Sequence, residues 1–168
     1  MFAYQTINST GQKYFLSGTK PRIFILSGTH GDEFDIVPLV EQAVAKYAPK
    51  LPDFLYIPAL SPSAVAIRTR KNGQQVDLNR SFFTDTKISE AQGIIKFLQP
   101  FKFDLVLNFH GDPILHDFYV YDTKNINGTK ELTALQSEIK NLGVGLFNGV
   151  DDPDDPMAEG EVGKVGVS

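Results

Sequence analysis

The chain has 168 residues, 42% of them hydrophobic and 21% charged, a composition that suits one globular domain with a buried core. No apolar run is long enough to cross a membrane, and the net charge of −4 argues against nucleic acid as the main partner. The N-terminus lacks the basic and apolar regions of a signal peptide, so we expect a cytoplasmic protein.

Strands and helices are predicted in alternation along the chain. Residues 2–17 alternate loosely around a Ser-Thr-Gly turn, which is typical of a short hairpin. Buried strands are predicted, in chain order, at 22–28, 53–60 and 103–110, with a fourth strand at 117–122. Apolar residues at helical spacing predict helices over 34–47, 88–98 and 132–142. This order predicts an α/β fold with a mixed, largely parallel sheet flanked by helices.

The segment 149–168 differs in composition from the rest of the chain. It is rich in acidic residues, Gly and Pro, which indicates a loop rather than a packed element. Its four Asp residues at 151, 152, 154 and 155 could bind a hard cation, but Pro153 interrupts any known calcium-loop spacing. We therefore expect a solvated acidic loop.

The first strand-end motif is "GTHGDE", which follows the predicted strand 22–28. It places His30 and Glu33 three residues apart on a turn that enters a helix. Because the chain has no Cys, a metal site here would use His and carboxylate ligands, and this pair could supply two of them. The alternative is that Asp32 and Glu33 are acids at a helix N-terminus, where the helix dipole favours them.

A second motif, "NFHGD", closes the predicted strand 103–110. His110 and Asn108 end an apolar run, where polar side chains need polar partners or a cavity. The carboxyl ends of parallel strands meet at one edge of a sheet, so His110 is expected to share a site with His30. The third histidine, His116, begins the next strand and is interpreted as structural.

The segment 68–83, "RTRKNGQQVDLNRSFF", concentrates four basic residues in a predicted loop. A solvated basic loop is one interpretation. However, Asn79 and Arg80 lie between Leu78 and the apolar pair Phe82-Phe83, which should draw them to the edge of the core. A half-buried guanidinium there needs an anion such as a substrate carboxylate. A second arginine could stabilise an oxyanion during attack by metal-bound water.

The three motifs, in this order, resemble those of the carboxypeptidase A-like zinc metallopeptidase superfamily. The resemblance covers residues 28–112 and is nearest to murein-peptide carboxypeptidases and to the succinylglutamate desuccinylase/aspartoacylase branch. It implies one zinc ion held by His30, Glu33 and His110. It also implies that Arg70 polarises the scissile carbonyl and that Asn79 and Arg80 bind the terminal carboxylate of the substrate.

One part of the superfamily's pattern is missing. The general base of the family is a Glu on a late strand, but Glu131 and Glu138 fall on a predicted helix, and Glu159 and Glu161 fall in the acidic tail. The covering Tyr of the family has no clear counterpart in Tyr119 or Tyr121. We therefore expect residues 1–168 to form a single catalytic domain that is incomplete on its C-terminal side.

These observations lead to three hypotheses about function. The first is a zinc metallocarboxypeptidase, a hydrolase that cleaves an amide bond next to a free carboxylate. The second is an N-acyl amino acid deacylase of the desuccinylase/aspartoacylase type, and the third is a non-catalytic zinc- or peptide-binding module. The expected partner is a peptide or N-acyl amino acid with a free carboxylate, without nucleic acid or membrane; the sequence does not specify the oligomeric state.

Overall fold

The computed structural model describes residues 2–112, 116–120 and 129–147. Among the described residues, the chain forms two compact units, one that ends at Gly111 and one that begins at Asp112. The first unit contains the sheet and all of the motif residues from Gly28 to Gly111. The single catalytic domain expected over 1–168 stays a prediction.

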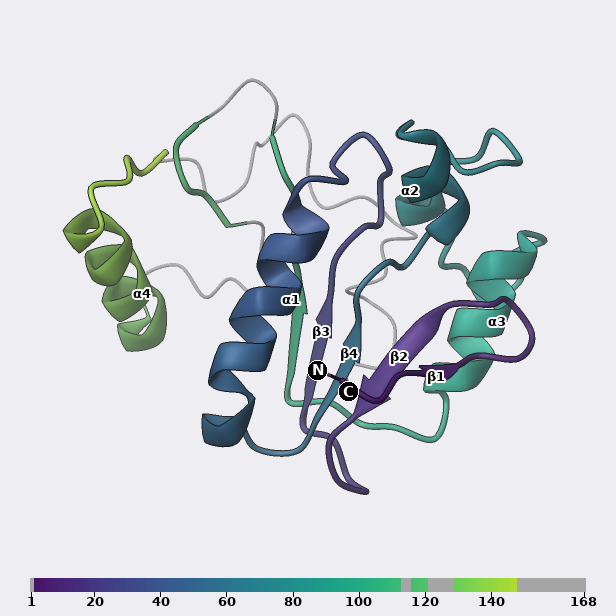
Figure 1. Cartoon of the computed structure of the whole chain (residues 1–168), viewed down its shortest axis with the longest axis horizontal. Coiled ribbons are helices and arrows are strands. Elements are labelled where there is room, and N and C mark those ends of the chain that lie inside the picture. The colour runs from purple at the N-terminus through teal and green to yellow at the C-terminus, as the bar shows by residue number, and fades with distance from the viewer. Residues whose placement is uncertain (1, 113–115, 121–128, 148–168) are drawn as a thin grey trace. The chain divides into compact units, whose positions relative to one another are not determined.

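Within the described residues, the sheet of the first unit has five strands in the order β1-β2-β4-β3-β5 (Figure 1). The strands are β1 Gln5–Thr6, β2 Lys13–Leu16, β3 Ile23–Leu26, β4 Phe54–Ile57 and β5 Leu105–Asn108. β2 pairs antiparallel with β1 and β4, whereas β3 pairs parallel with β4 and β5. The mixed sheet confirms the predicted fold class, and β1 and β2 confirm the predicted hairpin.

Helices pack on both faces of this sheet (Figure 1). Side chains alternate between the two faces of a strand, so Ile25 lies in one apolar cluster while Phe24 and Leu26 lie in the other. The cluster of Ile25 includes Val40 and Val44 of helix α1 (Ile36–Tyr47). The cluster of Phe24 includes three buried residues of helix α3 (Ser89–Leu98), namely Ala91, Ile94 and Leu98. Both helices were predicted from their apolar spacing.

Strand β5 corrects one expectation from the sequence. Residues 103–110 were expected to form a strand buried on both faces, but Leu105, Leu107 and Phe109 are 44%, 36% and 39% exposed. Pairing with β3 places Leu105 and Leu107 on the face of Ile25, where the described apolar cluster includes no residue of β5, whereas Val106 packs in the cluster on the other face. The apolar run predicted the strand correctly but did not show which of its faces is covered.

The second unit contains helix α4 (Lys130–Asn141), which confirms the helix predicted over 132–142. Gly143 follows it with a φ of +77°, the left-handed conformation that ends many helices. Of the predicted strand 117–122, only an isolated bridge between Phe118 and Leu146 is present in the described residues. Tyr121 and the acidic segment 149–168, including Glu159 and Glu161, lie outside the described residues.

The sequence did not predict three short helical elements. They are the helix α2 (Pro62–Ile67) and the 3-10 turns η1 (Ala48–Lys50) and η2 (Leu78–Arg80). α2 has six residues and begins with Pro62, so it offers too little apolar periodicity to detect. η1 extends the end of α1 through Pro49, and η2 carries the predicted Asn79 and Arg80.

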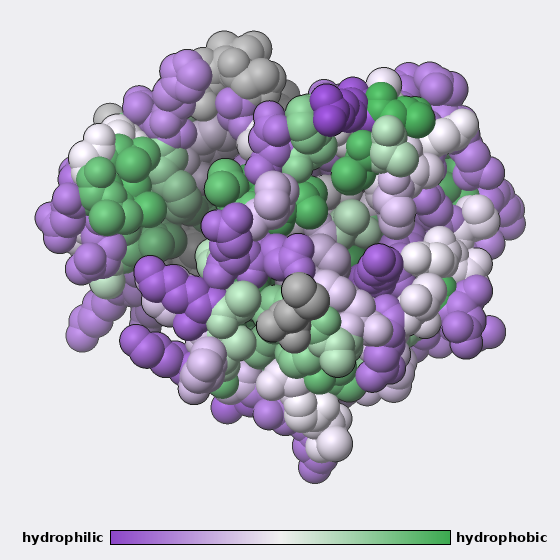
Figure 2. All heavy atoms as spheres, in the orientation of Figure 1, coloured by the Kyte–Doolittle hydropathy of each residue, from purple (hydrophilic) through white to green (hydrophobic). Residues whose placement is uncertain are grey.

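The surface mixes polar and apolar side chains. Hydrophilic residues cover much of the face shown in Figure 2, with hydrophobic residues exposed between them. Leu39 of α1 is one of the exposed hydrophobic residues, with 62% of its surface accessible. No helix among the described residues is long and apolar enough to cross a membrane.

Candidate metal centre

The site lies at the carboxyl ends of two neighbouring parallel strands. β3 and β5 are paired so that Leu26 lies opposite Asn108. His30 follows the end of β3 and His110 follows the end of β5, and their ring centroids lie 5.1 Å apart. The two histidines are 80 positions apart in the sequence (110 − 30), and the parallel pairing brings them to one edge of the sheet.

The turn after β3 is held tightly against α2. Gly28 adopts a φ of +59°, a left-handed conformation that favours glycine, and its carbonyl accepts a hydrogen bond from the Ser61 backbone. A Cβ on Gly31 would lie 1.9 Å from the backbone oxygen of Ala64, so no side chain fits there. Glycine at these two positions lets the chain pass close to α2 and deliver His30 to the site.

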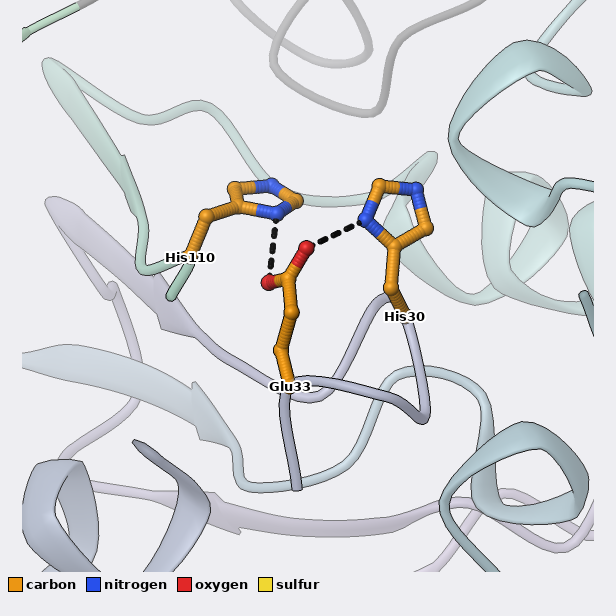
Figure 3. A group of neighbouring side chains, drawn as sticks. All are labelled: His30, Glu33 and His110. Carbon is orange, nitrogen blue, oxygen red and sulfur yellow. Dashed lines mark hydrogen bonds and ion pairs between the residues drawn. The ribbon is translucent and has the colours of Figure 1, made fainter. Parts of the chain in front are cut away.

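The carboxylate of Glu33 lies between the two imidazoles (Figure 3). Its Oε1 lies 2.7 Å from Nδ1 of His30, and its Oε2 lies 2.9 Å from Nδ1 of His110. The backbone N–H of Gly111 donates a further hydrogen bond to Oε2. α1 begins only at Ile36, so Glu33 is engaged by the two histidines rather than serving as an acid in the first turn of the helix.

The opposite edge of the His30 ring faces a second carboxylate. Nε2 of His30 lies 3.1 Å from Oδ1 of Asp77, while Oδ2 of Asp77 accepts a hydrogen bond of 3.1 Å from Nε of Arg70. Nη1 of Arg70 lies 3.5 Å from Nδ1 of His30. The His30 side chain is only 3% exposed, whereas Arg70 is 49% exposed at the rim of the site. Asp77 therefore fixes the ring of His30 from the side away from Glu33.

Sequence reasoning did not single out Asp77, although it lies inside the "VDLNR" segment. The available signal was an acidic residue between the apolar Val76 and Leu78, two positions before Asn79. Spacing alone could not reveal its partner, since His30 is 47 positions away.

The hydrogen bonds and charges of the site shift the pKa values of Glu33, Asp77 and His30. Burial alone would raise the pKa of Glu33, but the hydrogen bonds of His110 and His30 outweigh burial and lower that pKa to about 2. Burial would likewise raise the pKa of Asp77, but His30, Arg70 and the Asn79 backbone lower it to about 2. Burial would lower the pKa of His30, but Asp77 and Glu33 raise it above its ordinary value. Both carboxylates are therefore anionic at neutral pH.

The donor set fits a divalent transition metal. His30, Glu33 and His110 each offer one ligand atom, and these atoms all lie within 4.8 Å of one another. Two imidazole nitrogens and one carboxylate oxygen are a ligand set that zinc takes in hydrolases. A carboxylate such as Asp77 on the far nitrogen of a ligating histidine fixes its tautomer and orientation. His116 is exposed in the second unit and does not belong to this group.

Asn79 and Arg80 belong to η2, which begins directly after Asp77 in the sequence. The backbone N–H of Asn79 donates to Oδ1 of Asp77, the same oxygen that contacts His30. Asn79 is 6% exposed, and its side-chain oxygen has no hydrogen-bond partner within the described residues. Arg80 is half-buried and donates to the backbone oxygen of Asn79. The structure thus links these two residues to the histidine group through Asp77, and their role as a carboxylate clamp stays a prediction.

No family model matches the sequence, and no curated protein matches it. Three similar solved structures come from bacteria. A candidate metallopeptidase from Shewanella denitrificans has 19% sequence identity and a TM-score of 0.67, over 98% of this chain and 64% of that protein. An aspartoacylase family protein from Mesorhizobium loti has 24% identity and a TM-score of 0.56, over 86% of this chain and 51% of that protein. A metallo-carboxypeptidase from Burkholderia cenocepacia has 19% identity and a TM-score of 0.59, over 82% of this chain and 43% of that protein.

These comparisons establish the fold of the chain. It is the α/β fold shared by metallopeptidase, metallo-carboxypeptidase and aspartoacylase family structures. These are the groups that the sequence motifs resemble. The chain spans less than two thirds of the length of each of these three solved proteins.

Proposed function

We propose that this chain belongs to a zinc-dependent hydrolase that cleaves an amide bond next to a free carboxylate, a metallocarboxypeptidase. The observation that carries the proposal is the convergence of His30, Glu33 and His110 at the carboxyl ends of two parallel strands. The likeness in fold to candidate metallopeptidases supports it.

His30, Glu33 and His110 would hold the metal, and Asp77 would keep the His30 ring in place through Nε2. A zinc ion bound there supplies a Lewis acid, which polarises a carbonyl and lowers the pKa of a bound water to about 7. Arg70 brings a positive charge to the rim beside His30, where it would stabilise the negative charge that develops on the carbonyl oxygen.

The substrate carboxylate is assigned to Asn79 and Arg80. A guanidinium matches a carboxylate with two parallel hydrogen bonds, and the side-chain amide of Asn79 can add another. Asp77 bonds to both His30 and the Asn79 backbone, so it couples the predicted clamp to the metal ligands. The general base of the reaction is not assigned to any described residue.

The first test is metal content. Elemental analysis of the native protein and of His110→Ala, purified in parallel, should give about one zinc per native chain and a loss of zinc in the variant. His116→Ala is the matched control, since this exposed histidine lies outside the ligand group, and it should retain zinc. Native protein that binds no zinc after reconstitution would refute the proposal.

An N-acyl amino acid deacylase is the second candidate, which the likeness in fold to an aspartoacylase family protein favours. The same ligands would serve it, and the carboxylate clamp would hold a small acylated amino acid. Zinc-loaded protein incubated with a peptide panel and with N-acyl amino acids separates the two. Release of C-terminal residues alone would exclude the deacylase, and release of the acyl group alone would exclude the peptidase.

A non-catalytic zinc- or peptide-binding module is the third candidate, motivated by the unassigned general base. It would bind peptides without turning them over, so turnover by the zinc-loaded protein would exclude it. The cytoplasmic location expected from the sequence stays a prediction.

A further inference from the structure

Asn72 is the centre of the loop that carries Arg70 and Asp77. It is 1% exposed, and its side-chain oxygen accepts two hydrogen bonds of 3.0 Å, from the backbone N–H groups of Gln74 and Val76. Its own backbone N–H donates to the carbonyl of Val76 at 2.9 Å. One buried side chain thereby closes the segment 72–76 into a compact turn.

The remaining donor of Asn72 is anchored to a different element. Nδ2 of Asn72 donates a hydrogen bond of 2.7 Å to Oε2 of Glu90, in the first turn of α3. The Glu90 carboxylate also accepts from Ser63 of α2 and from Ser61, which precedes α2, at 3.1 and 3.4 Å. The hydroxyl of Ser63 in turn accepts from the backbone of Gly73. Glu90 therefore ties the turn to both α2 and α3.

The two ends of this turn reach the candidate metal centre. Arg70 lies two positions before Asn72 and Asp77 lies one position after Val76. Arg70 and Asp77 are joined by a 3.1 Å ion pair, and both face His30. Displacement of Asn72 would move both residues away from His30 at once.

We infer that Asn72 and Glu90 are positioning residues, which hold Arg70 and Asp77 against His30 although neither touches the metal ligands. This inference rests on the proposed function, since it assigns the purpose of the Asn72–Glu90 contact to that site. Its physical basis is a matched pair in which the amide donates and the carboxylate accepts, with a single negative charge between them.

A swap of the two chemical groups tests this pairing. Asn72→Asp places two carboxylates against each other, at a contact of 2.7 Å in the native protein, and removes the donor. In the double variant Asn72→Asp/Glu90→Gln, the new amide donates to the new carboxylate. The double variant has the same net charge and nearly the same volume as the native pair, so it should rescue the single variant.

The first measurement needs no metal. The loop contains Arg70 and Lys71, so trypsin can cleave there, and mass spectrometry of the fragments reports the rate at each bond. In metal-free protein, we expect Asn72→Asp to be cleaved several-fold faster after Arg70 and Lys71 than the double variant, which has the same residues around both bonds. A double variant cleaved as fast as the single one would overturn the inference.

The second measurement is zinc affinity, by competition with a chelator. Loss of a residue that supports a metal ligand typically costs about 10- to 100-fold in affinity, so Asn72→Asp should lose about 10-fold and the double variant should recover. Gln92→Ala is the matched control, since Gln92 also lies on α3 and bonds to a loop, but at Thr86. It should change neither readout.

The outcomes separate the two proposals. Native protein that binds no zinc refutes the proposed function, whereas the trypsin result still decides whether Asn72 and Glu90 anchor the loop. Faster cleavage of Asn72→Asp with rescue, but with unchanged zinc affinity in that variant, would show that the anchor does not act on His30 and would overturn the positioning role.

Discussion

Asp77 contacts Nε2 of His30 at 3.1 Å, on the edge of the ring opposite to Nδ1, which lies 2.7 Å from Glu33. Both nitrogens of one buried imidazole are therefore engaged, each by a different carboxylate. If Nδ1 binds a metal beside Glu33, Asp77 fixes the proton on Nε2 and raises the basicity of the ligand.

Replacing Asp77 by Asn should weaken zinc binding. Asn preserves the size of the side chain but removes the negative charge from Nε2 of His30, and we expect an affinity lower by about 10- to 100-fold. Competition with a chelator measures it. Asp85→Asn, a change at an exposed acid of the same chain, serves as the control and should bind zinc like the native protein. Equal affinities in all three proteins would show that Asp77 does not support the ligand.

Replacing Arg70 by Ala should lower kcat with little change in KM. The guanidinium lies beside His30 at the rim of the site, where it would act on charge that develops only in the transition state. Loss of one such donor costs about 10²- to 10³-fold in kcat. Steady-state kinetics on the zinc-loaded protein give both constants. A higher KM with native kcat would instead place Arg70 in ground-state substrate binding.

Replacing Arg80 by Ala should have the opposite kinetic signature. If Arg80 holds the carboxylate of the substrate, its loss removes a charge-assisted hydrogen bond, which contributes about 1.5–3 kcal/mol, and KM should rise by roughly 10- to 100-fold. A substrate whose terminal carboxylate is amidated provides the control, because the native enzyme and Arg80→Ala should then differ little. Native KM in Arg80→Ala would show that the clamp is assigned to the wrong residue.

The metal-free protein should lose stability in acid because of Glu33 and Asp77. The pKa of each is about 2 in the folded chain, against ordinary values of 4.5 and 3.8. A lowered pKa stabilises the fold above the ordinary value and loses that contribution as pH falls, so the loss should occur between about pH 4.5 and 2.

Urea denaturation in the presence of a chelator, at pH 5 and at pH 3, measures this loss. Each group contributes on the order of 2 kcal/mol, and Glu33→Gln should show a smaller difference between the two pH values than the native protein. The raised pKa of His30 acts in the opposite direction, with stability lost as pH rises above its ordinary 6.5, so both measurements stay below pH 6. If the native protein and Glu33→Gln lost the same stability between pH 5 and pH 3, the loss could not be assigned to Glu33.

The sequence predicted the parts of the site that depend on local pattern. Apolar runs located β3 and β5, and the polar residues after them identified His30, Glu33 and His110 as candidates that the structure brings together. Asp77 was not found because its contact with His30 depends on how the 70–77 loop folds back over the site.

The remaining errors concern tertiary context. The exposure of Leu105 and Leu107 depends on which face of β5 other elements cover, which a single apolar run does not encode. Helix α2 is too short to show a period, although its packing against Gly31 shapes the turn that carries His30. The hydrogen bonds of Asn72 were also not predicted, because an Asn in a polar segment is typical of an ordinary turn residue.

The pairing of β3 with β5 makes the candidate centre sensitive to errors in folding. Leu26 lies opposite Asn108, and His110 comes two positions later, so this register helps to set where His110 lies at the sheet edge. A slip of one residue would displace His110 by about 3.3 Å and turn the side chains of β5 to the opposite face. Such a misfolded chain would retain most of its helices and strands but would lack three converging ligands, so metal uptake would report correct strand alignment during refolding.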